Sequence, residues 1–150
     1  MMMRLGSPKL LKAMMVRMPI NASAVKMMLK QVGMKRAVES GKFDDDMLAW
    51  SVAIMKHTGT FKSETGNNTF ISLKGENPEF LFTDEVLQRL HMPVLLLWGD
   101  EDSNGGTHEA ETFTAQLPNA ILEIVDQAGH APWIDEIEFC GAKTRDFLRG

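Results

Sequence analysis

The sequence contains a single cysteine and no long apolar run, and both absences narrow the kind of protein that it encodes. Cys140 cannot form a disulfide within the chain, which fits a reducing compartment and predicts a cytoplasmic location. Because no stretch of 18 or more apolar residues occurs, we expect no membrane span. With 150 residues, 44% of them hydrophobic, the chain is long enough to form one domain with a core.

Acidic residues are missing from the first part of the chain. The first is Glu39, and eight lysines and arginines precede it, although the net charge of the whole chain is −4. A basic, acid-free, amphipathic start is typical of transit peptides and of helices that lie on a membrane surface. It is also typical of an ordinary solvated helix face, which is the interpretation we favour. A nucleic-acid partner is not expected, because the basic segment lacks interleaved aromatic residues and the chain is acidic overall.

Apolar residues recur at helical spacing through the first 57 residues. They predict helices over about 8–18, 22–32, 34–40 and 45–57. The second helix follows Asn21, Asp44 can cap the fourth, and Gly33 and Gly41 stand at the stops. Residues 60–82 predict no firm element, and Thr83 can cap a short helix over 85–90. Twelve methionines occur, mostly in these helices. They indicate either ordinary helix packing or an adaptable apolar wall over a substrate pocket.

A short apolar run, Val94–Trp98, lies between a proline and Gly99 and predicts a β-strand. It shows no alternation of polar and apolar residues, so both of its faces should be buried, as in a parallel sheet covered on both sides. Three acidic residues follow directly, Asp100 to Asp102. Acids just past the carboxyl end of such a strand lie where open α/β sheets place their chemistry.

The same pattern repeats further along the chain. A second run, Ile121–Val125, predicts another strand, and His130 follows it. Helices are expected over about 107–117 and 136–148, so the order is strand–helix–strand–helix with short connections, which predicts parallel strands. An acid, Asp102, and His130 at neighbouring strand ends are two parts of a nucleophile–base–orienter triad.

Three motifs in residues 92–148 resemble the C-terminal part of an α/β-hydrolase. They are Pro93-Val-Leu-Leu-Leu-Trp-Gly-Asp-Glu-Asp102, Leu117-Pro-Asn-Ala120 and Ala128-Gly-His-Ala-Pro-Trp133. Residues 7 to about 90 are similar, more loosely, to the helical cap inserted between the halves of that fold. The resemblance implies an α/β class and a partial α/β-hydrolase fold. Residues 91–150 would form two parallel strands with flanking helices, and residues 1–90 an all-helical cap, or lid.

The resemblance also implies catalytic roles for Asp102 and His130. The family's triad acid ends a Gly-x-x-Asp motif, which here begins at Gly99, and its triad base follows the glycine of a late Gly-His. His130 would take a proton from a nucleophile and return it to the leaving group. Asp102 would hold the imidazole tautomer and stabilise its cation. The implied reaction is hydrolysis of an ester-type bond in a small apolar substrate, with no cofactor and no metal.

The nucleophile of that family is missing from these residues. None of the seven serines lies in a Gly-x-Ser-x-Gly frame, and Ser103 occupies the position after the acid, where the family usually has a small apolar residue or proline. We therefore expect the C-terminal half of a truncated or split hydrolase. Such a chain would pair with a missing N-terminal half, or form an oligomer through the exposed edge of Val94–Trp98. The alternative is a non-catalytic fragment or binding partner.

A less favoured alternative is a calcium-binding loop at Asp100–Glu111, which fits the EF-hand pattern at every specified position. A strand-like run enters this loop instead of a helix, Thr107 replaces an aliphatic residue, and no second loop exists. Among the remaining candidates, we expect Cys140 to pack as a small apolar side chain and Trp133 to pack rather than line a pocket. His57, His91 and His108 are interpreted as surface or structural residues.

Overall fold

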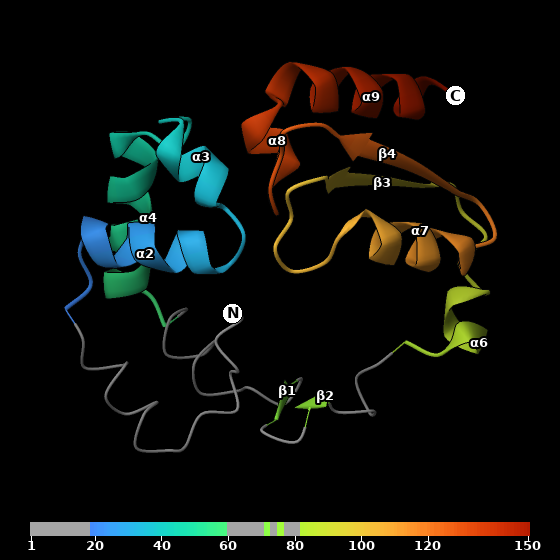
Figure 1. The fold of residues 1–150 in the computed structure, drawn as a ribbon, viewed down its shortest axis with the longest axis horizontal. Helices are drawn as coiled ribbons and strands as arrows, with labels where there is room; N and C mark the ends of the chain where they lie inside the picture. Colours follow the sequence, from blue (N-terminus) through green and yellow to red (C-terminus); the bar gives the residue numbers. More distant parts are fainter. Residues whose placement is uncertain (1–18, 60–70, 73–74, 77–81) are drawn as a thin grey trace. The chain divides into compact units, whose positions relative to one another are not determined.

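The computed structural model describes residues 19–59, 71–72, 75–76 and 82–150, which belong to two compact units (Figure 1). The first unit contains the described residues among 1–28 and 44–81, and the second contains 29–43 and 82–150. Within the described residues the chain is a mixed α/β protein. No helix in this part of the chain is both long and apolar enough to cross a membrane. The boundary at residue 90 between cap and core stays a prediction.

Helices dominate the described part of the first unit. Helix α2 (Ala22–Gln31) begins in this unit, and its N-cap Asn21 accepts a hydrogen bond from the Ala24 amide at 2.9 Å. Helix α4 (Asp45–His57) is capped by Asp44, whose Oδ1 accepts from the Met47 amide at 2.8 Å. Both helices and the Asp44 cap confirm the sequence prediction. The helix predicted over 8–18 lies outside the described residues.

A short antiparallel pair corrects the prediction that residues 1–90 are all helical. Strands β1 (Ile71–Ser72) and β2 (Gly75–Glu76) pair through Ile71 with Glu76 and Ser72 with Gly75. Each strand has two residues, which is too short to produce the alternation that identifies strands in a sequence. The pair falls in the stretch where the sequence predicted no firm element.

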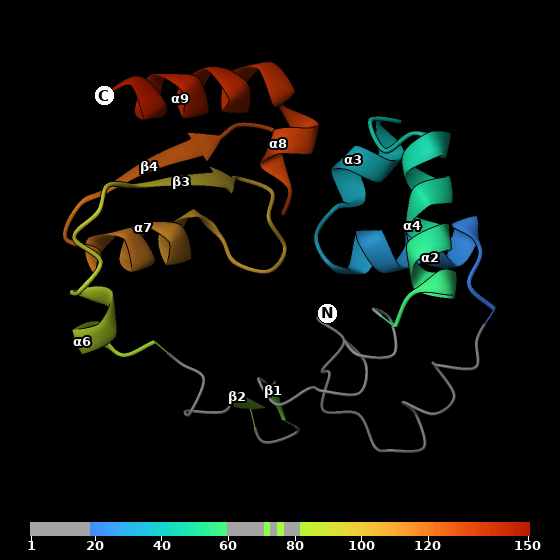
Figure 2. The same ribbon diagram turned by 180° about the vertical axis from the view of Figure 1, so that it is seen from behind.

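The second unit is built on a parallel two-stranded sheet. Strands β3 (Val94–Gly99) and β4 (Ala120–Val125) pair in register from Val94–Ala120 to Gly99–Val125. Helix α7 (Thr107–Ala115) connects them and lies on one face of the sheet, while helix α9 (Ile137–Arg149) lies on the other, as both views show (Figures 1 and 2). This arrangement confirms the predicted strand–helix–strand–helix order with parallel strands.

Three shorter helices complete the second unit. Helix α6 (Asp84–Leu87) begins at the predicted cap Thr83 but is shorter than expected. Helix α3 (Lys35–Glu39) lies within the predicted range 34–40 and is followed by Gly41 with a positive φ of 77°. Helix α8 (Pro132–Asp135) was not predicted, because a four-residue helix carries no periodic apolar pattern. It starts at a proline, which is favoured in the first turn.

The core of the second unit lies between the sheet and α9. Val125, Ala128 and Cys140 form a buried cluster, and Leu97 packs against it. Burial raises the pKa of the Cys140 thiol, and the carboxylates of Glu136 and Asp135 act in the same direction. Cys140 is 2% exposed, which confirms that it packs as a small apolar side chain.

The sheet is less buried than its sequence predicted. The side chains from Val94 to Trp98 are half-buried, and on β4 Ile121 and Ile124 are 51% and 36% exposed. Among the described residues β3 and β4 pair with no other strand. A helix covers each face, as predicted, but the missing neighbouring strands leave the margins of the sheet open to solvent, so the burial is only partial.

Candidate active site

The carboxyl ends of β3 and β4 bring two loops together at one edge of the sheet. The Asp100 amide donates to the Val125 carbonyl at 3.1 Å, and the Glu101 amide donates to the Ala128 carbonyl at 2.9 Å. A Cβ atom on Gly99 would overlap the carbonyl oxygens of Ala128 and Gly129. The absence of a side chain at Gly99 therefore allows the loop after β4 to cross directly over the end of β3.

Asp102 and His130, the two residues singled out in the sequence, are hydrogen-bonded to each other. His130 Nδ1 lies 2.8 Å from Asp102 Oδ2, and the other carboxylate oxygen accepts from the Asn104 amide at 2.8 Å. The Asp102 side chain is 6% exposed, whereas the His130 side chain is 50% exposed. A buried carboxylate that is hydrogen-bonded to Nδ1 orients the imidazole. The other imidazole nitrogen, Nε2, remains available for proton transfer. The catalytic role of the pair stays a prediction.

A turn from another part of the second unit supports this pair. Gly33 follows α2 with φ of 87°, and its carbonyl accepts from the His130 amide at 2.9 Å. The neighbouring Val32 carbonyl accepts from Asn104 Nδ2 at 2.9 Å. A Cβ on Gly33 would lie 2.8 Å from the His130 Cβ and 3.2 Å from Asp102 Oδ1. The sequence predicted Gly33 as a helix stop, but it carried no signal that this stop contacts the loops after the strands.

A buried carboxylate holds the residue before His130. Asp135, on α8, is 1% exposed, and its Oδ2 accepts from the Gly129 amide at 2.9 Å. Its Oδ1 has no hydrogen-bond partner within the described part of the chain. Sequence reasoning missed Asp135. The available signal was an acid five residues after a candidate catalytic histidine and three residues after Pro132, which can start a helix.

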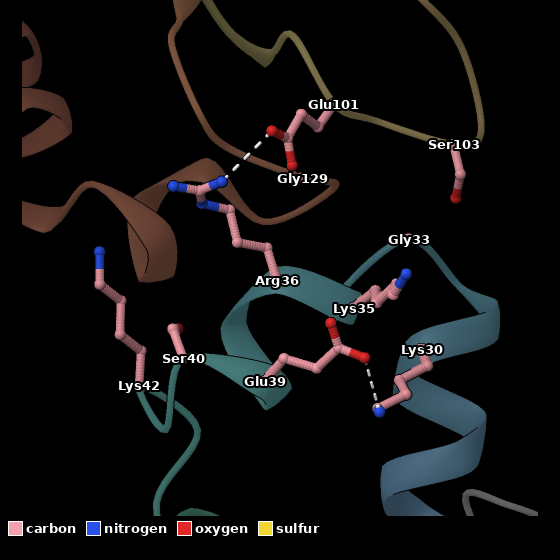
Figure 3. A pocket seen from close by; sticks show the side chains of 10 residues that line it. All are labelled: Lys30, Gly33, Lys35, Arg36, Glu39, Ser40, Lys42, Glu101, Ser103 and Gly129. Atoms are coloured by element: carbon pink, nitrogen blue, oxygen red, sulfur yellow. Dashed lines mark hydrogen bonds and ion pairs between the residues drawn. The ribbon is translucent and has the colours of Figure 1, made fainter.

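A cleft of about 570 Å³ opens next to these loops (Figure 3). It lies wholly within the second unit, and its wall includes residues that adjoin both members of the pair, since Ser103 follows Asp102 and Gly129 precedes His130. Its side chains are polar or charged: Lys30, Lys35, Arg36, Glu39, Ser40, Lys42, Glu101 and Ser103, with Gly33 and Gly129. No methionine is among these lining residues in the part of the chain that the structure describes.

The calcium-loop alternative does not have the required geometry. A strand, β3, enters the loop where an EF-hand has a helix, and Asp102 is directed to His130. Asp100 Oδ1 accepts from the Ala128 amide at 3.2 Å. In the part of the chain that the structure describes, no group of three or more His, Cys, Asp or Glu side chains is arranged to hold a metal ion.

Trp133 and the three remaining histidines are all exposed. Trp133 is 56% exposed, so the expectation that it packs was wrong; it lies on the outer side of the short helix α8. His57, His91 and His108 are exposed, as interpreted from the sequence.

No family model matches the chain, but parts of it are similar to curated hydrolases. It is 31% identical over 65 residues to the pimeloyl-[acyl-carrier protein] methyl ester esterase of Neisseria meningitidis, covering 43% of this chain and 25% of that protein. It is 31% identical over 72 residues to the carboxylesterase YbfK of Bacillus subtilis, covering 47% of this chain and 24% of the relative. The uncharacterized hydrolase YugF of Bacillus subtilis is 31% identical over 65 residues, with 43% and 24% covered. The chain thus spans about a quarter of the length of these relatives and shares sequence with hydrolases, among them esterases.

Proposed function

We propose that this chain carries the acid and base of an α/β-hydrolase site that cleaves an ester-type bond in a small substrate. The observation that carries the proposal is the 2.8 Å contact between His130 Nδ1 and Asp102 Oδ2 at the carboxyl ends of two parallel strands. The similarity to esterases in part of the sequence supports the same reaction class.

The proposed mechanism uses His130 as a proton shuttle. His130 Nε2 takes the proton of an attacking hydroxyl, so that the hydroxyl oxygen forms a bond to the ester carbonyl carbon. The imidazolium then gives this proton to the departing alkoxide, and water repeats the two steps to release the acid. Asp102, buried and held by the Asn104 amide, stabilises the imidazolium and keeps Nδ1 protonated.

The nucleophile is proposed to come from outside these 150 residues, because no serine here stands in a Gly-x-Ser-x-Gly frame. The same missing part would supply the oxyanion donors, each of which is worth about 10²–10³ in rate. The unpaired edges of β3 and β4 are candidate attachment sites for further strands, from a missing N-terminal half or from a second copy. The alternative function, a non-catalytic binding partner, needs no nucleophile.

Two measurements test the acid–base pair. In ¹⁵N NMR of the full chain, neutral His130 is expected to carry its proton on Nδ1, and Asp102→Asn should remove this preference. Fused behind an N-terminal hydrolase half that has the Gly-x-Ser-x-Gly motif, the chain should support p-nitrophenyl acetate hydrolysis. His130→Ala should lower that rate by about 10²- to 10⁴-fold.

The matched control is His108→Ala, which removes another exposed histidine, one on α7 that has no part in the pair. It should leave both the His130 signal and the rate of the fusion unchanged. A neutral His130 protonated on Nε2, or a folded fusion whose rate is the same with and without His130, would exclude the acid–base role and favour the binding-partner alternative.

A further inference from the structure

The cleft beside the Asp102–His130 pair is rich in basic side chains. Among the described residues, four basic and two acidic side chains line it, which gives the wall an excess of positive charge, whereas the net charge of the whole chain is −4. The basic residues are Lys30, Lys35, Arg36 and Lys42, and the acidic ones are Glu39 and Glu101. A cleft lined by charges of mainly one sign concentrates ligands of the opposite sign.

Most of these basic side chains are held in exposed ion pairs. Lys30 Nζ lies 2.9 Å from Glu39 Oε1, and Arg36 Nη1 lies 3.2 Å from Glu101 Oε1, with the side chains of both pairs between 33% and 53% exposed. Lys42 pairs with Glu136 at 3.1 Å. Exposed pairs contribute little to stability, so an incoming anion can compete for these cations at small cost.

Lys35 differs from the other three. It has no ion-pair partner in the part of the chain that the structure describes, and it is exposed at the start of α3. In Figure 3 its side chain lies along the cleft wall between Gly33 and Lys30. The hydroxyl of Ser103, on the opposite loop, also has no hydrogen bond among the described residues, and it lines the same cleft. An ammonium group and a hydroxyl are both donors that an anion accepts.

We propose that this cleft binds the anionic group, a carboxylate or a phosphate, of a small ester whose scissile bond lies at His130. The proposal rests on the proposed function for the reaction and adds the substrate class. The cleft adjoins the acid through Ser103 and the base through Gly129, so an anion held there would anchor the substrate close to the pair. The anchored charge would supply the orientation that makes the attack effectively intramolecular.

The test measures binding without turnover. The ¹⁵N-labelled full chain is titrated at constant ionic strength with glutarate, with inorganic phosphate and with the neutral dimethyl glutarate. The two anions should shift the amides of Gly33, Ser103 and Gly129, and the neutral diester should not. Lys35→Gln should weaken anion binding by about fivefold, and Lys35→Glu should weaken it more. Lys26→Gln, which removes an exposed lysine of α2 that does not line the cleft, is the matched control and should change nothing.

Each outcome bears on the proposal. Shifts with glutarate alone indicate a carboxylate-bearing substrate, and shifts with phosphate alone indicate a phosphate-bearing one. Equal shifts from the neutral diester, no shifts at all, or equal weakening by Lys35→Gln and Lys26→Gln would overturn it. The binding test needs no turnover, so it is independent of the proposed reaction. If the chain binds anions but His130 fails the tautomer and fusion tests, the proposed reaction is refuted and the anion site remains.

Discussion

Gly33 brings a backbone turn against the candidate catalytic pair, and a substitution tests whether this position must lack a side chain. Gly33→Ala is expected to lower the free energy of unfolding by more than the 1–2 kcal/mol or so that a left-handed backbone costs a residue with a Cβ. The new Cβ would lie 2.8 Å from the His130 Cβ, so the loop must also shift. Urea denaturation measures the loss, and the His130 imidazole signals report the shift.

Gly41→Ala is the matched control for this substitution. Gly41 has a similar φ of 77°, but a Cβ there would meet nothing within 4 Å. Gly41→Ala should therefore lower the free energy of unfolding only by the cost of the left-handed backbone, and it should leave the His130 signals unchanged. If both alanine variants lose the same stability and neither changes His130, the turn does not support the pair.

Glu39 provides a prediction about pH. The hydrogen bond from the Lys30 ammonium, together with the charges of Lys30 and Lys35, holds the pKa of Glu39 below its ordinary value of 4.5. Because the folded-state pKa is lowered, the ionised carboxylate stabilises the fold above its unfolded pKa, and this contribution is lost as the pH falls through the folded value. Lys30→Gln is expected to raise the pKa, which a ¹³C NMR titration of the Glu39 carboxyl measures. Lys26→Gln should leave it where it is, and a pKa that ignores Lys30 would contradict the assigned cause.

Part of the candidate site could be predicted residue by residue. Asp102 and His130 follow two apolar runs, and parallel strands place their carboxyl ends together, so the meeting of these two residues follows from local patterns. Gly33, Asn104 and Asp135 were not predicted as neighbours of the pair, and only Asp135 had a sequence signal, its place shortly after His130. Their contacts depend on how a turn and a short helix pack against the loops, and a single sequence does not encode that packing as a period or a motif.

At the scale of elements, the cap of α4 should determine how firmly that helix begins. Asp44→Ala is expected to cost about 1 kcal/mol, because the Met47 amide loses the carboxylate that it donates to at 2.8 Å. Asp46→Ala is the control, since it removes an acid from the same first turn but no capping bond. Hydrogen exchange of the first-turn amides should speed up for Asp44→Ala and change much less for Asp46→Ala. Equal effects would mean that the general charge near the helix start, and not the cap, is what matters.

Elements with strong local signals were predicted well. Helices α2 and α4 and strands β3 and β4 begin and end within a few residues of their predicted limits, because caps, glycines and apolar periods mark them. The misses are short elements, namely α8 and the β1–β2 pair. The burial of β3 was overestimated because an unbroken apolar run indicates a covered strand, whereas the number of neighbouring strands depends on the rest of the fold.

At the scale of the whole molecule, the matched region covers 25% of the length of the Neisseria esterase. Among the described residues, the parallel sheet of the second unit has two strands. A hydrolase site assembled from this chain therefore depends on strands and a nucleophile that these residues do not contain. The same open sheet that would accept those strands can pair with a second copy. Self-association and completion by another half would thus compete for the same edges.

This competition yields a prediction about oligomeric state. Ile121, on β4 beside Leu95 of β3, is 51% exposed, and Ile121→Lys would place a charge next to the open strand edge. We expect the wild-type chain to associate as its concentration rises, and the variant to need about tenfold more protein, corresponding to 1.4 kcal/mol. Analytical ultracentrifugation measures both. Ile137→Lys is the control, because Ile137 is 69% exposed at the start of α9 and is not part of a strand. A wild-type chain that stays monomeric at all concentrations would exclude edge pairing between copies. If Ile121→Lys and Ile137→Lys weaken self-association equally, the association uses exposed apolar surface in general and not the strand edge.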